Sequence, residues 1–246
     1  MSSRPNALVL LLAVVFGPLP AAANCVLDIS DHQIPITTGF AGRDVLLFGT
    51  VEGPSDVVVT LRGPRTEVVM FRKAQMLGIW VNADRMPFKK TPSFFAMASS
   101  RTIEEIASDS ERKLHQLGAE YLVDLPRARG SPGVRETWKQ ALLRNMADQG
   151  LYPSSVQNVT FLGQSLFRTR LTLPSNVPTG EYQASAFCLV DGKVQSAWTI
   201  PLFVEKVGVE AEIFDFAHNY SLLYGLIAVL LALMAGWMAH LAFGRS

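Results

Sequence analysis

Two cysteines are the first residues in this sequence that could do chemistry, because Cys25 and Cys188 are its only thiols. In an oxidising compartment, free thiols tend to pair. A Cys25–Cys188 disulfide would close a loop of about 163 residues. In the chain-entropy model, this closure stabilises the folded state by up to about 5 kcal/mol. Cys188 has the same parity as Tyr182, Ala184 and Ala186 in an alternating segment, so we expect it to face a core. The alternative is two unpaired cysteines, and without a C-x-x-C spacing we expect no redox or metal pair.

Motifs for hydrolysis and metal binding are incomplete. Ser110 and Lys113 match the S-x-x-K pattern of penicillin-recognising enzymes, but the K-T-G partner is missing because Pro92 follows the Lys89–Thr91 stretch. The histidines do not lie at ligand spacing from one another, and no H-E-x-x-H occurs. We therefore expect no enzyme activity, no cofactor and no metal site.

Basic residues gather in short stretches that could hold an anion or lie on acidic lipid headgroups. The first stretch includes Arg62, and the second contains Arg85, Lys89 and Lys90. Trp80 lies between them, and tryptophan is common at binding hot spots. The alternatives are a solvated basic face and a tryptophan that packs in the core. Our candidates for an anion-binding or partner surface are Arg62, Arg65, Arg72, Lys73 and Trp80.

The composition limits the class of protein that must position these residues. Of 246 residues, 49% are hydrophobic and 17% are charged, which excludes intrinsic disorder. The 22 basic residues nearly balance the 21 acidic ones, so we expect no nucleic-acid partner.

The apolar excess is concentrated at the two ends, and the N-terminal end predicts a secretory signal over residues 1–23. Arg4 precedes the apolar run Ala7–Phe16, and Ala21-Ala22-Ala23 fits the small-residue cleavage rule. The mature chain would then begin at Asn24. The alternative, an uncleaved anchor, needs an apolar run nearer 20 residues.

The C-terminal end predicts a transmembrane helix over residues 219–243. Its run from Tyr220 to Phe243 has no Asp, Glu, Lys or Arg, and about 24 helical residues span roughly 36 Å, enough for a bilayer core. The alternative is a buried core helix. With a cleaved signal, residues 24–215 would lie in the periplasm and residues 244–246 in the cytoplasm, so we expect a single-pass protein of a bacterial inner membrane.

Small residues recur on this helix at every fourth position, at Ala228, Ala232 and Gly236. Such a stripe lets two membrane helices approach closely. It predicts a membrane-protein partner or a homodimer in addition to the lipid bilayer, although small residues are also common in membrane helices generally.

Between the two ends, the sequence predicts a mainly β domain. Runs of β-branched residues are separated by Gly and Pro at a spacing typical of a sandwich. Asp191-Gly192 predicts the turn of a hairpin. The predicted strands are 43–49, 56–62, 66–72, 77–81, 166–173, 182–190 and 194–204.

Residues from about 99 to 150 predict a helical insertion in this domain. Thr102 and Glu105 match a capping box, and a second helix is expected from near Pro132 to Gly150. In the first helix the apolar residues at helical spacing are Ile103, Ile106, Ala107, Leu114 and Leu117. We therefore expect an immunoglobulin-like β-sandwich with a two-helix insertion, followed by one transmembrane helix.

Several stretches are distinctive as a set, namely Phe48-Gly49, Asp56–Val59, Arg62–Pro64, Gly78–Asn82, Pro92–Ala96, Pro178–Tyr182, Leu223–Gly225 and Gly236-Trp237. With them, the chain from Asn24 to Phe243 resembles a family of predicted single-pass transmembrane proteins of alphaproteobacteria. The resemblance implies a membrane location and topology, and it implies no catalytic residues. A loose association of such proteins with sulfite-exporter-like transporters implies a transporter as a possible partner.

Together these patterns favour a non-catalytic accessory or adaptor protein that positions an exported domain beside another inner-membrane protein. The alternative is a periplasmic domain that binds or senses a small anion through one of the arginine clusters. A cell-envelope hydrolase is the third hypothesis.

Overall fold

The structure is a computed structural model that describes residues 24–123, 132–207 and 216–243. The predicted signal segment 1–23, residues 124–131 of the predicted helical insertion, residues 208–215 at the end of the predicted periplasmic domain, and the predicted tail 244–246 lie outside these residues. What is described is mainly β, as predicted, and it ends in one apolar helix.

One sheet has four strands, which are all antiparallel to their neighbours. Residues of the third strand alternate strictly between exposed and buried from Leu166 to Leu173, which confirms the strand predicted over these residues. The order is β1 (Cys25–Ile29), β3 (Arg43–Val51), β10 (Leu166–Leu173) and β9 (Thr160–Leu162).

The other large sheet has six strands, and its centre is the hairpin predicted at Asp191-Gly192. Both turn residues have positive φ, 51° and 77°, and Val190 pairs with Lys193 across the turn. The order is β2 (Gln33–Ile36), β12 (Lys193–Lys206), β11 (Gly180–Val190), β4 (Asp56–Arg62), β7 (Phe95–Ser99) and β8 (Gln157–Asn158).

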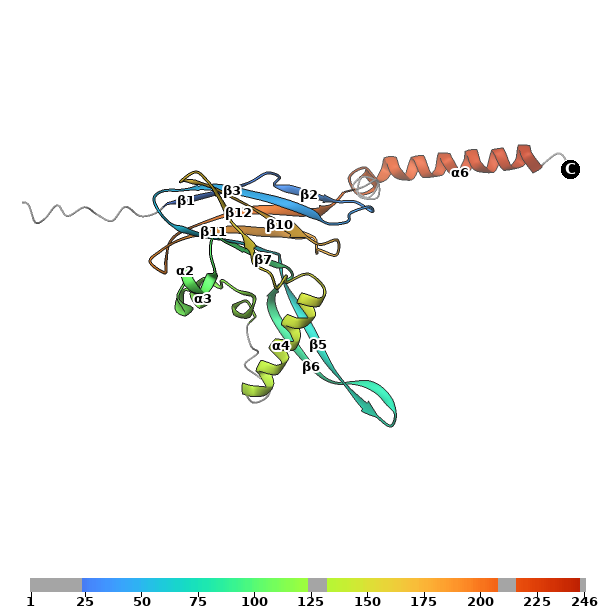
Figure 1. The fold of residues 1–246 in the computed structure, drawn as a ribbon. Helices are drawn as coiled ribbons and strands as arrows, with labels where there is room; N and C mark the ends of the chain where they lie inside the picture. The colour runs from blue at the N-terminus through green and yellow to red at the C-terminus, as the bar shows by residue number, and fades with distance from the viewer. Residues whose placement is uncertain (1–23, 124–131, 208–215, 244–246) are drawn as a thin grey trace, which may run out of the picture.

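The two sheets lie against each other, and buried residues of both form one apolar core (Figure 1). Strand β4 is buried on both of its faces. Val57, Val59 and Leu61 share the face on which Cys188 meets Cys25 of the four-stranded sheet. The opposite face carries Arg62, which meets the helical insertion.

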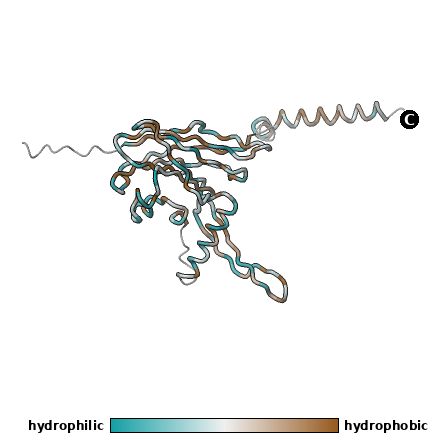
Figure 2. The backbone as a smooth tube through the Cα atoms, in the orientation of Figure 1, coloured by the Kyte–Doolittle hydropathy of each residue, from teal (hydrophilic) through white to brown (hydrophobic). Residues whose placement is uncertain are grey.

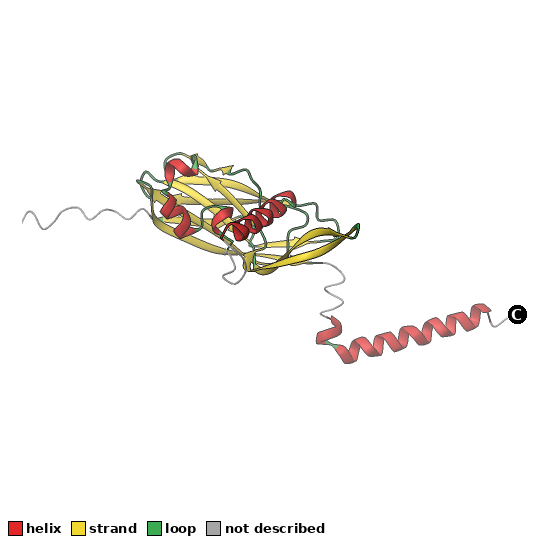
Figure 3. Cartoon of the chain, turned by 90° about the horizontal axis from the view of Figure 1, so that it is seen from below, coloured by secondary structure: helices red, strands yellow, loops and turns green. Residues whose placement is uncertain are grey.

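Helices of the insertion cover this second face of the six-stranded sheet (Figure 3). The Phe187 ring lies 5.6 Å, between ring centres, from the His115 ring at the end of the second of these helices, with the two rings tilted by 58°. The fourth helix buries Trp138, Leu142 and Met146. The elements are α2 (Ile103–Ile106), α3 (Asp109–His115), the 3₁₀ turn η1 (Ala119–Tyr121) and α4 (Pro132–Asp148).

The prediction of one helix from Ile103 to Leu117 was wrong. The chain breaks at Ala107, and Ser108 begins α3 by accepting a hydrogen bond from the backbone N–H of Glu111 (3.3 Å). The Thr102 side chain makes no cap hydrogen bond, so the predicted capping box does not form. Because the break changes the helical phase, Leu114 is 72% exposed instead of facing the core.

The strands predicted at 66–72 and 77–81 do not join either large sheet. They belong to a separate two-stranded hairpin of β5 (Arg65–Met76) and β6 (Ile79–Pro92), which projects away from the sheets (Figure 1). Leu77 and Gly78, which were placed in a strand, form its turn. Alternation within one strand indicates its conformation but not its partner, so the sequence could not place this pair.

Arg62 joins β4 to the insertion. Its Nη2 donates to the carbonyl oxygens of His115 (2.8 Å) and Gln116 (3.1 Å), at the C-terminal end of α3, where a cation complements the helix dipole. Burial, and then the nearby charge of Arg65, lowers the pKa of Arg62. The two hydrogen bonds therefore offset the cost of burying the charged Arg62 side chain, and they fix the position of α3.

Replacing Arg62 with methionine should release α3 because the apolar stem stays while both hydrogen bonds are lost. We expect a loss of about 1 kcal/mol in the free energy of unfolding, and faster hydrogen exchange at the α3 amides than at those of β4. Exchange can be followed by mass spectrometry on the full chain in detergent. Arg65→Met, at an exposed position, is the control, and equal α3 exchange in both variants would contradict this role of Arg62.

Candidate functional site

The structure brings the two cysteines together from opposite ends of the chain. Cys25 begins β1 and Cys188 lies in β11, so the pair bridges the two sheets. Both thiols are buried and free, and their side chains hydrogen-bond to each other. Ser196 completes the cluster, because its hydroxyl lies 3.5 Å from the Cys25 sulfur and accepts from the Cys25 backbone N–H at 3.1 Å. Cys188 faces the core as predicted.

The contact makes the two thiols chemically different. A hydrogen bond from Cys188 lowers the pKa of Cys25 to about 7 although burial opposes this shift. The same bond, together with burial, raises the pKa of Cys188, which keeps its proton. Cys25 is therefore the thiol that ionises first, and thiolate is the form that attacks a disulfide. A disulfide between Cys25 and Cys188 stays a prediction.

The basic candidates are spread over the molecule rather than gathered at one point. Arg62 is engaged with the end of α3. Arg72 pairs with Asp84, its cross-strand neighbour in the hairpin. Arg65 and Lys73 are exposed on β5. Within the described residues, these side chains do not converge on a pocket that could enclose a small anion.

The outer end of the hairpin is apolar and uncovered. Trp80 is 66% exposed, so it lies on the surface and not in a core. Its neighbours Met76, Leu77 and Ile79 are exposed by 60%, 103% and 68%, and Figure 2 shows hydrophobic residues at this end of the hairpin. The sequence patterns pointed to Trp80 alone. Leu77 and Ile79 were assigned to a strand and Met76 to none, and the missing signal was the turn at Leu77-Gly78.

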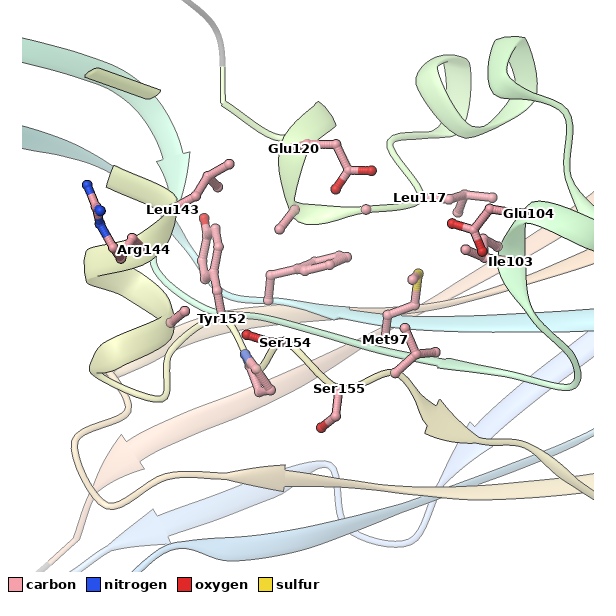
Figure 4. Close-up of a pocket in the computed structure, with 16 residues that line it drawn as sticks. Met97, Ile103, Glu104, Leu117, Glu120, Leu143, Arg144, Tyr152, Ser154 and Ser155 are labelled. Atoms are coloured by element: carbon pink, nitrogen blue, oxygen red, sulfur yellow. The ribbon is translucent and has the colours of Figure 1, made fainter. Parts of the chain in front are cut away.

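A cavity of about 420 Å³ lies between β7 and the helical insertion (Figure 4). Apolar residues such as Phe95, Met97 and Leu117 form much of its wall. Its charged lining groups are Glu104, Glu120 and Arg144, and Glu104 pairs with Arg112 at 3.3 Å. Two carboxylates against one guanidinium do not suit an anion, and none of the predicted surface residues lines this cavity.

The motif that resembles a hydrolase nucleophile is not set in a cleft. Ser110 and Lys113 are exposed on α3, and the Ser110 hydroxyl lies 3.0 Å from that of Ser108. In the part of the chain that the structure describes, no cluster of three or more His, Cys, Asp or Glu side chains could hold a metal ion.

The predicted membrane helix is present as α6 (Ser221–Phe243), close to the predicted bounds. Its segment Ser221–His240 is long and apolar enough to cross a membrane, and none of it is buried against the rest of the described chain. Ala228, Ala232 and Gly236 all lie on this exposed surface, so nothing in the fold occupies the small-residue stripe.

Comparison with known proteins agrees with this arrangement. A family model described as "Putative transmembrane protein (Alph_Pro_TM)" matches residues 24–245, which confirms the resemblance seen in the sequence. No curated protein matches the chain.

We expect the Cys25–Cys188 pair to be a disulfide in the chain isolated from membranes without reductant. The denatured protein would then take up no alkylating label before reduction and two labels after it, as intact-mass spectrometry can measure. Reduction should also lower the denaturation midpoint, because the loop of about 163 residues is worth up to about 5 kcal/mol. Full labelling without reduction would contradict the pairing.

Proposed function

This chain belongs to the Alph_Pro_TM family, and we propose that it is a non-catalytic accessory or adaptor protein of a bacterial inner membrane. In this proposal the signal 1–23 is cleaved, residues 24–215 lie in the periplasm, and the tail 244–246 lies in the cytoplasm. The adaptor holds its β domain beside another membrane protein, and a transporter is the partner class that we favour.

The observation that carries the proposal is the uncovered surface of α6. No described part of the β domain packs on this helix, so its whole surface is open to lipid and to other helices. Ala228, Ala232 and Gly236 recur at every fourth position, which places them on one side of the helix as a small-residue groove. Small residues let a second helix approach closely enough for van der Waals packing. The second helix belongs to a partner or to another copy of the chain.

The described side chains support a binding role over catalysis or anion capture. Several arginines make structural contacts, as Arg62 does with α3 and Arg101 with Asp56. The cavity between β7 and the helical insertion carries two carboxylates and one guanidinium. Small-anion binding and cell-envelope hydrolysis therefore stay secondary hypotheses, because each needs polar groups that converge on one point.

The proposal also takes the two sheets as an immunoglobulin-like sandwich. Support comes from the two antiparallel sheets that share one core and from the cysteine pair that joins them. Such a sandwich is a stiff support for a contact surface, which is what an adaptor needs.

A partner should co-purify with the full-length chain from mild detergent and be lost when α6 is replaced by a polyleucine helix. We expect the same loss with Gly236→Leu, because a large side chain fills the groove on the helix. Mass spectrometry of the purified complex, or cross-linking of differently tagged copies, identifies the second helix.

The matched control is Met234→Phe, which adds bulk on the opposite side of α6 and should keep the partner. If the polyleucine anchor and Gly236→Leu both retain it, the contact does not lie on this groove, and the adaptor proposal loses its main support. Ligand screening of the β domain would then test the anion-binding alternative.

A further inference from the structure

The β5–β6 hairpin is half built into the fold and half outside it. Near its base, Met86 and Phe88 are buried at 4% and 0% exposure and belong to the core. In the outer part of β6, every residue from Ile79 to Arg85 is exposed. The base therefore holds the hairpin in a fixed direction, and the outer half serves no packing need of the domain.

The turn at the outer end of the hairpin carries Leu77 in a backbone conformation that disfavours folding and with a side-chain exposure that disfavours solubility. Leu77 has φ 51° and Gly78 has φ 83°, as in the type I′ turns that prefer Asn-Gly. A leucine is strained in this left-handed conformation. Its side chain is also fully exposed at the apex, at 103%. A bulky apolar residue kept at such a position indicates contact with something outside the domain.

The hairpin leaves the domain at the end of the sheet from which the chain continues toward α6. Arg62, just before β5, pairs with Gln183, which in turn pairs with Pro201 near the end of β12. At the hairpin base, Pro64 packs so closely on Gly180 that a Cβ there would come within 2.8 Å. The base of the hairpin and the exit of β12 at Lys206 are therefore neighbours.

The covalent distances allow the apex to reach the membrane that holds α6. Strand β5 has 12 residues and can extend about 40 Å. The eight positions 208–215 between β12 and α6 can span at most about 30 Å. A hairpin that points toward the bilayer can therefore touch it at any length of this connection.

Charge in the hairpin favours an anionic surface. Residues 65–92 contain six basic residues and two acidic ones, although the whole chain has a net charge of only +1. The basic residues nearest the apex, Arg72, Lys73 and Arg85, are exposed along the outer strands. A tryptophan among aliphatic residues, with cations set back from the apex, is typical of segments that enter a membrane interface.

We propose that the hairpin apex, formed by Met76, Leu77, Ile79 and Trp80, inserts into the bilayer leaflet next to the domain as a second membrane contact. Its apolar side chains enter the acyl boundary while the exposed lysine and arginines lie at acidic headgroups. A lipid surface fits better than a protein because a stable protein interface uses about 20 residues a side, and the apex offers four. This contact goes beyond the adaptor role and does not depend on it.

Lipid-dependent quenching of Trp80 tests the insertion in the full chain. The protein is reconstituted into phosphatidylcholine–phosphatidylglycerol vesicles with or without brominated acyl chains. The chain has four tryptophans, so the Trp80 signal is the difference between the wild type and Trp80→Phe. We expect this difference to be quenched by brominated lipid and protected from aqueous iodide. The matched control is Trp198→Phe, which removes a 46% exposed tryptophan on β12. The fluorescence lost in this variant should be fluorescence that brominated lipid does not quench.

Leu77→Asn separates insertion from folding, because asparagine tolerates the left-handed turn while its side chain is polar. This variant should keep the hairpin, yet lower the ratio of inserted to free apex roughly tenfold, which follows from the loss of one buried leucine. The proposal is overturned if Trp80 is equally accessible to iodide in vesicles and in detergent and brominated lipid leaves it unquenched. It is also overturned if Leu77→Asn leaves strong lipid quenching of Trp80 unchanged.

Discussion

Strand β4 is buried on both faces, and the positions of the other elements depend on this constraint. A strand in such a place needs an apolar layer on each side. The four-stranded sheet supplies one layer, and the cysteine pair lies between the sheets. The helical insertion supplies the other, where Arg62 meets the carbonyl end of α3. The hairpin and the exit toward α6 are then set at one end of this three-layered body.

Most of the exposed large apolar side chains of the described residues lie in two places. One is α6, which no described residue of the domain covers, and the other is the apex around Leu77 and Trp80. Contiguous exposed apolar surface normally marks an interaction site or a membrane contact. In contrast, the charged groups that could have served chemistry are used in structure or are separated from one another. This distribution fits the adaptor proposal, in which a stiff domain is held at a membrane and presented to a neighbour.

The sequence predicted the elements whose signal is local. Residues 56–62 and 166–173 match β4 and β10, and Asp191-Gly192 forms the expected turn. The alternation of apolar and polar residues and the preference of certain residues for turns both act over a few positions. These signals therefore do not depend on how distant parts of the chain pack. The break at Ala107 was missed because the apolar period continues across it, whereas the hydrogen bond that caps α3 at Ser108 leaves no mark on the apolar pattern.

The site was less predictable because it depends on contacts between distant residues. Trp80 could be singled out, but its exposure follows from the pairing of β5 with β6 in a separate sheet. Arg72 looked available in the sequence, and its partner Asp84 is set by a register that shifts at Arg72/Lys73. Cys188 was expected in the core, yet only the packing of the sheets brings Cys25 to it.

The adaptor account is tested most directly by photo-cross-linking in native membranes. A photoreactive amino acid is placed at Ala232, in the small-residue groove, or at Met234 on the opposite side of α6, and the membranes are irradiated without extraction. The account predicts a protein adduct of defined mass from position 232, to a membrane protein or a second copy, and lipid adducts alone from position 234. Lipid adducts alone from both positions would contradict it.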